Sequence, residues 1–152
     1  MLFSKACIYG IRATFYVSLY QGKREFIPIN EISDALGISF HFLTKILQKL
    51  TRNSIMISYR GPKGGITLAR APEDISILEI IKAIDGEESL NSCILGLPGC
   101  GTERPCPLHD EWGPKRDALY QIFANTTLKN INEKFLIENF RISWKDNGGS
   151  TH

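Results

Sequence analysis

The sequence predicts a mostly α-helical protein with a small β wing, built as a winged helix-turn-helix followed by a long dimerisation helix. Apolar residues recur at three- and four-residue spacings in several separate segments, which is typical of amphipathic helices. Two of these segments are short and are joined by a tight turn at Gly37. A basic, glycine-rich turn over residues 60–65 then lies between two short β-type runs, and this order predicts a hairpin beside the helix pair.

The first predicted helix covers residues 5–21, and Gly22 lies near its C-terminal cap. Its apolar residues are three or four positions apart and therefore share one face: Ile8, Ile11, Phe15 and Leu19. A short extended link that contains Pro28 follows this helix.

The next two predicted helices form the helix-turn-helix pair. The first runs from about residue 30 to 36 with Asn30 as its N-cap, and Gly37 supplies the turn. The second follows its N-cap Ser39 and runs to about Arg52. The expected buried stripe of this second helix consists of Leu43, Ile46, Leu47 and Leu50.

The predicted wing consists of two short strands at residues 56–59 and 66–69. A further helix is predicted over residues 76–85, and Gly86 ends it. Its apolar positions again follow the helical period: Ile77, Ile80, Ile81 and Ile84.

The C-terminal part begins with an irregular stretch rich in glycine, proline and cysteine, and loops of this length are usually functional. Helical spacing resumes from Leu108 to about residue 124, with a kink or a late start expected at Pro114. The predicted organisation is a winged helix-turn-helix domain at 1–86, a cysteine-rich loop at 87–107, a dimerisation helix and a short following helix at 108–135, and a partly disordered tail at 136–152.

Charge is distributed unevenly along the 152 residues, although the overall net charge is only +2. Residues 1–70 hold ten basic and three acidic side chains, a net charge of +7, and the remainder has a net charge of −5. This asymmetry indicates a polyanionic partner for the first half, with uneven surface charge and no partner as the alternative.

No apolar run is long enough to cross a membrane, so no membrane partner is expected. Lys5 and Arg12 interrupt the apolar N-terminal stretch, which does not resemble a signal peptide. A cytoplasmic location is therefore expected. No Ser/His/Asp arrangement stands out among the three histidines, so no enzymatic activity is expected.

The second helix of the pair has the position of a recognition helix, whose N-terminal residues meet base edges in the major groove of double-stranded DNA. The residues expected there are Ser39, Phe40, His41, Thr44 and Lys45. Lys49 lies further along the helix and is better placed for phosphates, and Arg60 and Lys63 of the wing can reach the backbone or the minor groove. The alternative is an ordinary solvated helix face.

Three cysteines, Cys93, Cys100 and Cys106, are spaced C-x₆-C-x₅-C, and His109 follows three residues later. Thiolate sulfur is the usual ligand of iron–sulfur clusters, and a flexible loop lets three separated sulfurs converge. Three cysteines and one histidine are also a structural zinc set, but no C-x₂₋₄-C knuckle is present. Reactive thiols without metal are the third possibility.

Taken together, these residues resemble the Rrf-two-type regulators, a family that includes IscR, NsrR and CymR. The resemblance extends from Ser4-Lys5 to about residue 135. Its most specific parts are the wing Arg60-Gly61-Pro62-Lys63-Gly64-Gly65, the helix end Ile80-Ile81-Lys82-Ala83-Ile84-Asp85-Gly86, and Cys106-Pro107-Leu108-His109 followed by Trp112.

The resemblance implies a homodimer that packs along the long helix after the cysteines and reads a pseudo-palindromic operator. It also implies that an iron–sulfur cluster on the three cysteines controls operator affinity. In IscR-like members a histidine at the position of His109 completes a 2Fe–2S site, which favours 2Fe–2S over 4Fe–4S here.

The chain also departs from the family pattern. The first cysteine gap is one residue longer than in IscR, and Thr44 stands where IscR has an acid. NsrR-like members take an acidic ligand from the partner's first helix, but Ile8 occupies that position here, beside Cys7 as another candidate ligand. Two alternatives remain: a cluster-free regulator of the same fold that senses thiol oxidation or a partner, and a small iron–sulfur electron-transfer protein.

Overall fold

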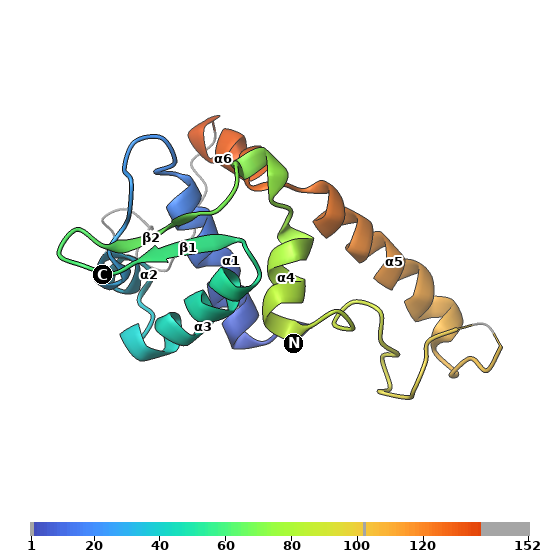
Figure 1. Cartoon of the computed structure of the whole chain (residues 1–152). Helices are drawn as coiled ribbons and strands as arrows, with labels where there is room; N and C mark the ends of the chain where they lie inside the picture. The colour runs from blue at the N-terminus through green and yellow to red at the C-terminus, as the bar shows by residue number, and fades with distance from the viewer. Residues whose placement is uncertain (1, 102, 138–152) are drawn as a thin grey trace, which may run out of the picture.

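The structure is a computed structural model that describes residues 2–101 and 103–137, and it confirms the mostly α-helical fold with a two-stranded wing (Figure 1). The two strands form one antiparallel sheet. The elements in chain order are α1 (Lys5–Ser18), α2 (Ile29–Leu36), α3 (Phe40–Arg52), β1 (Met56–Tyr59), β2 (Gly65–Leu68), a short 3₁₀ turn (Pro72–Asp74), α4 (Ile77–Asp85), α5 (His109–Asn125) and α6 (Leu128–Ile137).

The first two helices differ from their predicted bounds, for reasons that lie in side-chain and backbone bonding. α1 ends at Ser18 rather than residue 21, because the backbone N–H groups of Tyr20 and Gln21 bond to carbonyls three residues back instead of four, as at a tightened helix end. α2 begins at Ile29 with Pro28 as its N-cap, not Asn30. Proline fixes its own φ angle, and the Pro28 carbonyl accepts the backbone N–H of Glu31 at 3.1 Å.

The turn and the second helix of the helix-turn-helix pair fold as predicted. Gly37 ends α2 in the left-handed conformation, with φ of 67°, which costs glycine no steric strain. The Ser39 side chain caps α3 by accepting the backbone N–H of Phe42 at 3.3 Å. The predicted stripe of α3 is buried in the core and comprises Leu43, Ile46, Leu47 and Leu50.

The wing lies against the link between α1 and α2. In the antiparallel pair Met56 is opposite Leu68, so β2 begins one residue earlier than predicted. Ile27 pairs with Ile66 through two backbone hydrogen bonds of 2.8 and 2.9 Å. A Cβ atom at Gly65 would lie 2.2 Å from the Ile27 carbonyl oxygen, so this close approach requires glycine.

α4 connects the wing to the cysteine loop. Ser76 and Glu79 form a reciprocal capping box at its start, and Gly86 ends it as predicted. Its first turn is joined to the α5–α6 connection, because Ile77 donates its backbone N–H to the Thr126 carbonyl at 2.9 Å. α4 therefore ties the wing and the helix-turn-helix to the C-terminal helices.

α5 projects from the body of the molecule, and the irregular segment before it runs back along this helix (Figure 1). The helix passes through Pro114 without a late start. Pro114 lies near the N-terminal end, so its missing N–H removes only the bond to the Asp110 carbonyl. The short last helix extends to Ile137 rather than 135, and the rest of the predicted tail lies outside the described residues. Within residues 2–101 and 103–137 no helix is long and apolar enough to cross a membrane.

Candidate functional site

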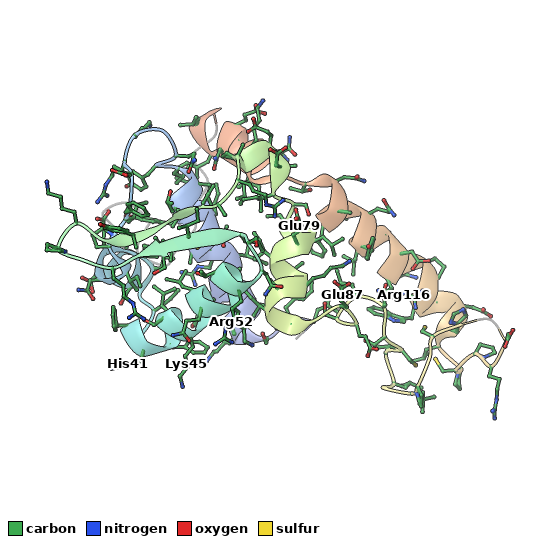
Figure 2. The ribbon with its side chains drawn as sticks, viewed as in Figure 1. His41, Lys45, Arg52, Glu79, Glu87 and Arg116 are labelled. Atoms are coloured by element: carbon green, nitrogen blue, oxygen red, sulfur yellow. The ribbon has the colours of Figure 1, made fainter. Side chains whose placement is uncertain are left out.

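The outer face of α3 carries cations and no acid. His41, Lys45 and Lys49 follow one another at four-residue steps and are exposed, so they share one side of the helix. Figure 2 shows His41 and Lys45 on this side, toward the start of α3. The hydroxyl of Thr44 donates to the Phe40 carbonyl at 2.8 Å, and Ser39 and Phe40 are exposed at the helix start.

An open groove of about 860 Å³ separates α3 from the wing. Arg60 lies on its wing side, and Lys63 is exposed at the tip of the same hairpin. Tyr59 stacks on Phe26 with ring centroids 5.2 Å apart, which holds the wing against the link before α2. The α3 side of the groove is formed by Phe40, Thr44, Leu47, Gln48, Thr51 and Arg52.

Lys49 has a contact that sequence reasoning missed. Its Nζ donates to the Ile84 carbonyl at 3.3 Å, at the C-terminal end of α4. The recognition helix is thereby bonded to α4 two residues before Gly86, where the cysteine loop begins. No local sequence pattern indicates this bond, because the two residues are 35 positions apart.

The same end of α4 is bonded to the start of α1. Asp85 accepts hydrogen bonds from the backbone N–H of Ser4, at 2.9 Å, and from the Ser4 hydroxyl. Ser4 in turn caps α1, because its side-chain oxygen accepts the backbone N–H of Cys7. Burial, followed by the nearby Asp85 carboxylate, raises the pKa of the Cys7 thiol to about 12. Since a metal ligand must be a thiolate, this environment favours Cys7 as a core residue rather than a ligand.

Cys93 is the buried member of the cysteine loop, and the local backbone surrounds its sulfur. Its carbonyl accepts the backbone N–H of Gly96 at 2.9 Å in a tight turn. The pKa of its thiol is lowered because the backbone N–H groups of Leu95 and Leu97 donate to the sulfur. Such N–H donors stabilise thiolate, the form that binds iron.

The four candidate ligands lie in two pairs. The Cys93 and Cys106 thiols are close enough to influence each other, and burial, followed by the Cys93 and Cys100 sulfurs, raises the pKa of Cys106. Cys100 Sγ is 3.6 Å from His109 Nδ1. Within the described part of the chain, no three metal-ligating side chains converge closely enough to hold a single ion.

Donors in two pairs fit a two-iron cluster, because each iron of a 2Fe–2S centre takes two protein ligands. Residues of α5 hold the pairs in place. Trp112 donates its indole N–H to the Ser92 carbonyl at 3.3 Å, just before Cys93. The His109 ring lies over Gly113, where a Cβ atom would be 3.6 Å from ring Cε1. The donor set and its supports are therefore compatible with an iron–sulfur cluster.

A basic helix at the recognition position and a wing define a winged-helix DNA-binding regulator, to which a separate thiol-rich segment is attached. The chain belongs to the Rrf2 family, described as iron-dependent transcriptional regulators, whose model matches residues 3–134. Members of this family regulate transcription and are not enzymes, in agreement with the sequence-based expectation.

Individual relatives agree with this assignment. The chain is 30% identical to an HTH-type transcriptional regulator of Aquifex aeolicus, over 90% of this chain and 96% of that one. It is 31% identical to the HTH-type transcriptional regulator IscR of Sodalis glossinidius, over 84% and 78% of the two chains. Its fold matches CymR, the global cysteine regulator of B. subtilis, with a TM-score of 0.73, 23% identity and coverage of 86% and 95%.

Proposed function

We propose that this chain is a homodimeric, IscR-like transcriptional regulator whose affinity for double-stranded DNA is controlled by an iron–sulfur cluster. The observation that carries the proposal is the cysteine loop. It pairs Cys93 with Cys106 and Cys100 with His109, and it leaves the fold at the end of α4 that is bonded to α3. As a protein that acts on DNA, it is expected in the cytoplasm.

The N-terminal residues of α3 would meet base edges in the major groove, and the wing would contact the backbone or minor groove. The α3 helices of the two protomers would each read one half of a pseudo-palindromic operator. The two half-sites would lie about one turn of the DNA helix, or a multiple of it, apart. The residues proposed for DNA contact are Ser39, Phe40, His41, Thr44, Lys45, Lys49, Arg60 and Lys63.

The proposed dimer would pack along α5. This helix projects from the body, and its Ile122 side chain is 57% exposed, which is unfavourable in water for so large an apolar group. A second copy of α5 would cover it. Half-sites on a palindromic operator require this two-fold arrangement.

The cluster would be held by Cys93 and Cys106 as one pair and by Cys100 and His109 as the other. The pairing favours 2Fe–2S, with 4Fe–4S as the alternative. When bound, such a cluster supplies a one-electron couple and a group that oxygen or nitric oxide can destroy. The protein's own part is to supply thiolates, as the lowered pKa of Cys93 favours, and to transmit the shape of the loop.

Transmission would run through the end of α4. The loop begins at Gly86, directly after Asp85 and Ile84, which are bonded to α1 and α3 respectively. A change in the loop would therefore reach α3 through two residues of backbone. Coupling between distinct sites typically amounts to about 1–3 kcal/mol.

Anaerobic purification tests the cluster. We expect iron and sulfide in the protein and visible sulfur-to-iron absorption that is altered by His109→Ala but not by Cys7→Ala. A colourless, iron-free protein after reconstitution would overturn the proposal. An unchanged spectrum for His109→Ala would remove His109 from the ligand set.

Operator binding tests the DNA interface. We expect Lys45→Ala/Arg60→Ala to weaken binding about tenfold or more, because two cations near phosphates or bases are lost. The matched control Lys115→Ala/Lys129→Ala removes two exposed cations from α5 and α6 and should bind as the parent does. Equal affinity of the two double variants would contradict the proposed docking.

The contact between the Cys93 and Cys106 thiols favours a second function, in which the iron-free protein senses oxidation. In that case a peroxide would oxidise both thiols to a disulfide and be reduced to water, taking up the two electrons and two protons that the thiols release. Loss of two titratable thiols in an iron-free protein, reversed by dithiothreitol and coupled to operator affinity, would favour this alternative over the cluster.

A further inference from the structure

A buried cation lies beside the cysteine loop. The side chain of Arg116 on α5 is only 12% exposed. Its Nε and Nη2 atoms both donate to Asp117 Oδ1, at 3.1 and 2.9 Å. The third nitrogen, Nη1, is shielded from solvent and has no hydrogen-bond partner within the described residues. A buried charged donor left without an acceptor is rare and indicates a missing anionic partner.

The position of Arg116 indicates where that partner would lie. Arg116 follows His109 by seven residues, or two helical turns, so both residues share one face of α5. Figure 2 shows Arg116 on the side of α5 that faces the cysteine loop. His109 on this face contacts Cys100 at 3.6 Å, and its imidazole ring lies beside Gly113, between the two turns.

The electrostatics agree with this placement. The pKa of the Arg116 guanidinium lies above its ordinary value, first because Asp117 accepts its hydrogen bonds and further because the Cys100 side chain is close. Asp117 alone cannot explain the burial, since its own side chain is 70% exposed and an ion pair on the surface needs no shielded nitrogen. The Cys100 sulfur is the other group near enough to act on the guanidinium.

We infer that Arg116 is an electrostatic positioning residue of the cysteine site. Its Nη1–H would donate to the Cys100 sulfur once that sulfur is the thiolate of a bound group, and its charge would favour the more negative, reduced state of that group. The inference rests on the proposed iron–sulfur function. Reduction adds one electron from an external reductant such as dithionite and converts one ferric ion to ferrous, while Arg116 keeps its proton throughout.

The midpoint potential of the cluster-loaded protein tests this role. We expect Arg116→Gln to shift the balance between oxidised and reduced cluster about tenfold toward the oxidised form, or about 59 mV for a one-electron couple. Arg116→Lys keeps the charge and should retain most of the parent potential. Lys115→Gln is the matched control, because it removes a neighbouring exposed cation from the same helix and should leave the potential unchanged.

The outcomes separate this inference from the function on which it rests. A loaded Arg116→Gln protein with the same potential as Lys115→Gln overturns the inference and leaves the proposed function standing. A parent protein that binds no iron overturns the proposed function itself. Loss of the cluster from Arg116→Gln alone, with circular dichroism of the iron-free variants unchanged, supports the inference because the cation is then required to hold the group.

Discussion

The recognition helix and the cysteine loop are held in place by different kinds of contact. α3 is fixed by a buried stripe within the common core, so the side of the helix on which its cations lie is set by core packing. The loop over residues 87–101 and 103–107 contributes Leu90 to the core but is otherwise held by isolated contacts, such as those of Trp112 and Cys93, and its Ile94, Leu95 and Leu97 side chains are exposed. The comparison teaches that the surface formed by α3 and the wing is a product of core packing, whereas the shape of the proposed sensing segment would depend on what it binds.

Replacing one proposed ligand should give the largest effect, and it should be confined to the loop. We expect Cys106→Ser to remove the cluster completely, because three remaining donors cannot complete two pairs. The free energy of unfolding of the iron-free protein should change by less than about 0.5 kcal/mol, since Cys106 is outside the core. Iron and sulfide analysis and urea unfolding of the iron-free protein measure the two quantities. A large loss of stability would contradict the separation of the two regions.

An isoleucine-to-alanine substitution should lower the free energy of unfolding strongly in α3 and hardly at all in the cysteine loop. Ile46→Ala in α3 should lower the free energy of unfolding by about 2–5 kcal/mol, because Ile46 is 1% exposed and its loss leaves a cavity. Ile94→Ala in the cysteine loop should change it by less than about 0.5 kcal/mol, because Ile94 is 47% exposed. Urea unfolding of both iron-free variants checks the difference. Equal effects would show that the loop is part of the core.

The hydrogen bond between Lys49 and Ile84 connects the two regions, because it joins α3 to the end of α4 from which the cysteine loop starts. Lys49→Ala should bring the operator affinities of the cluster-loaded and iron-free forms together, removing part of a coupling of about 1–3 kcal/mol. Lys45→Ala should instead weaken both forms to a similar extent. Fluorescence anisotropy with each form measures this. If Lys49→Ala also weakened both forms equally, Lys49 would be a phosphate contact, as its position on α3 first predicted.

The features that could be predicted from the sequence are the local ones. The α3 stripe and the caps at Ser39 and Ser76 follow from periodicity and from capping rules that act over a few residues. The N-cap of α2 was misassigned to Asn30, because the preceding Pro28 can take the same role with its carbonyl. Local patterns do not specify which helix ends meet in space, so they predict neither the Ser4–Asp85 bond across 81 positions nor the burial of Arg116.

The candidate site follows the same division. The spacing of the cysteines identified the residues of the loop, but not their pairing, because a loop without periodicity has no predictable geometry. Arg116 carries one sequence signal that could have been used, namely its seven-residue distance from His109 on a predicted helix. Its burial and its free nitrogen required the tertiary structure.

The smallest predicted effect concerns the capping box at the start of α4 and should leave the iron content unchanged. Burial opposes ionisation of Glu79, but the Ser76 backbone N–H and Arg70 outweigh it and lower the pKa of the Glu79 carboxyl. The stabilisation from this carboxylate is therefore present above the unfolded pKa of about 4.3 and is lost as the pH falls through the lower folded value. We expect Glu79→Ala to lower the free energy of unfolding by about 1 kcal/mol at pH 7, mostly through the capping box, since the bond to Arg70 is partly exposed. The difference from the parent should shrink as urea unfolding is repeated at decreasing pH through the carboxyl range, with the iron content the same in both proteins at pH 7. A difference that stays constant with pH would mean that the helix end depends on the shape of Glu79 and not on its charge.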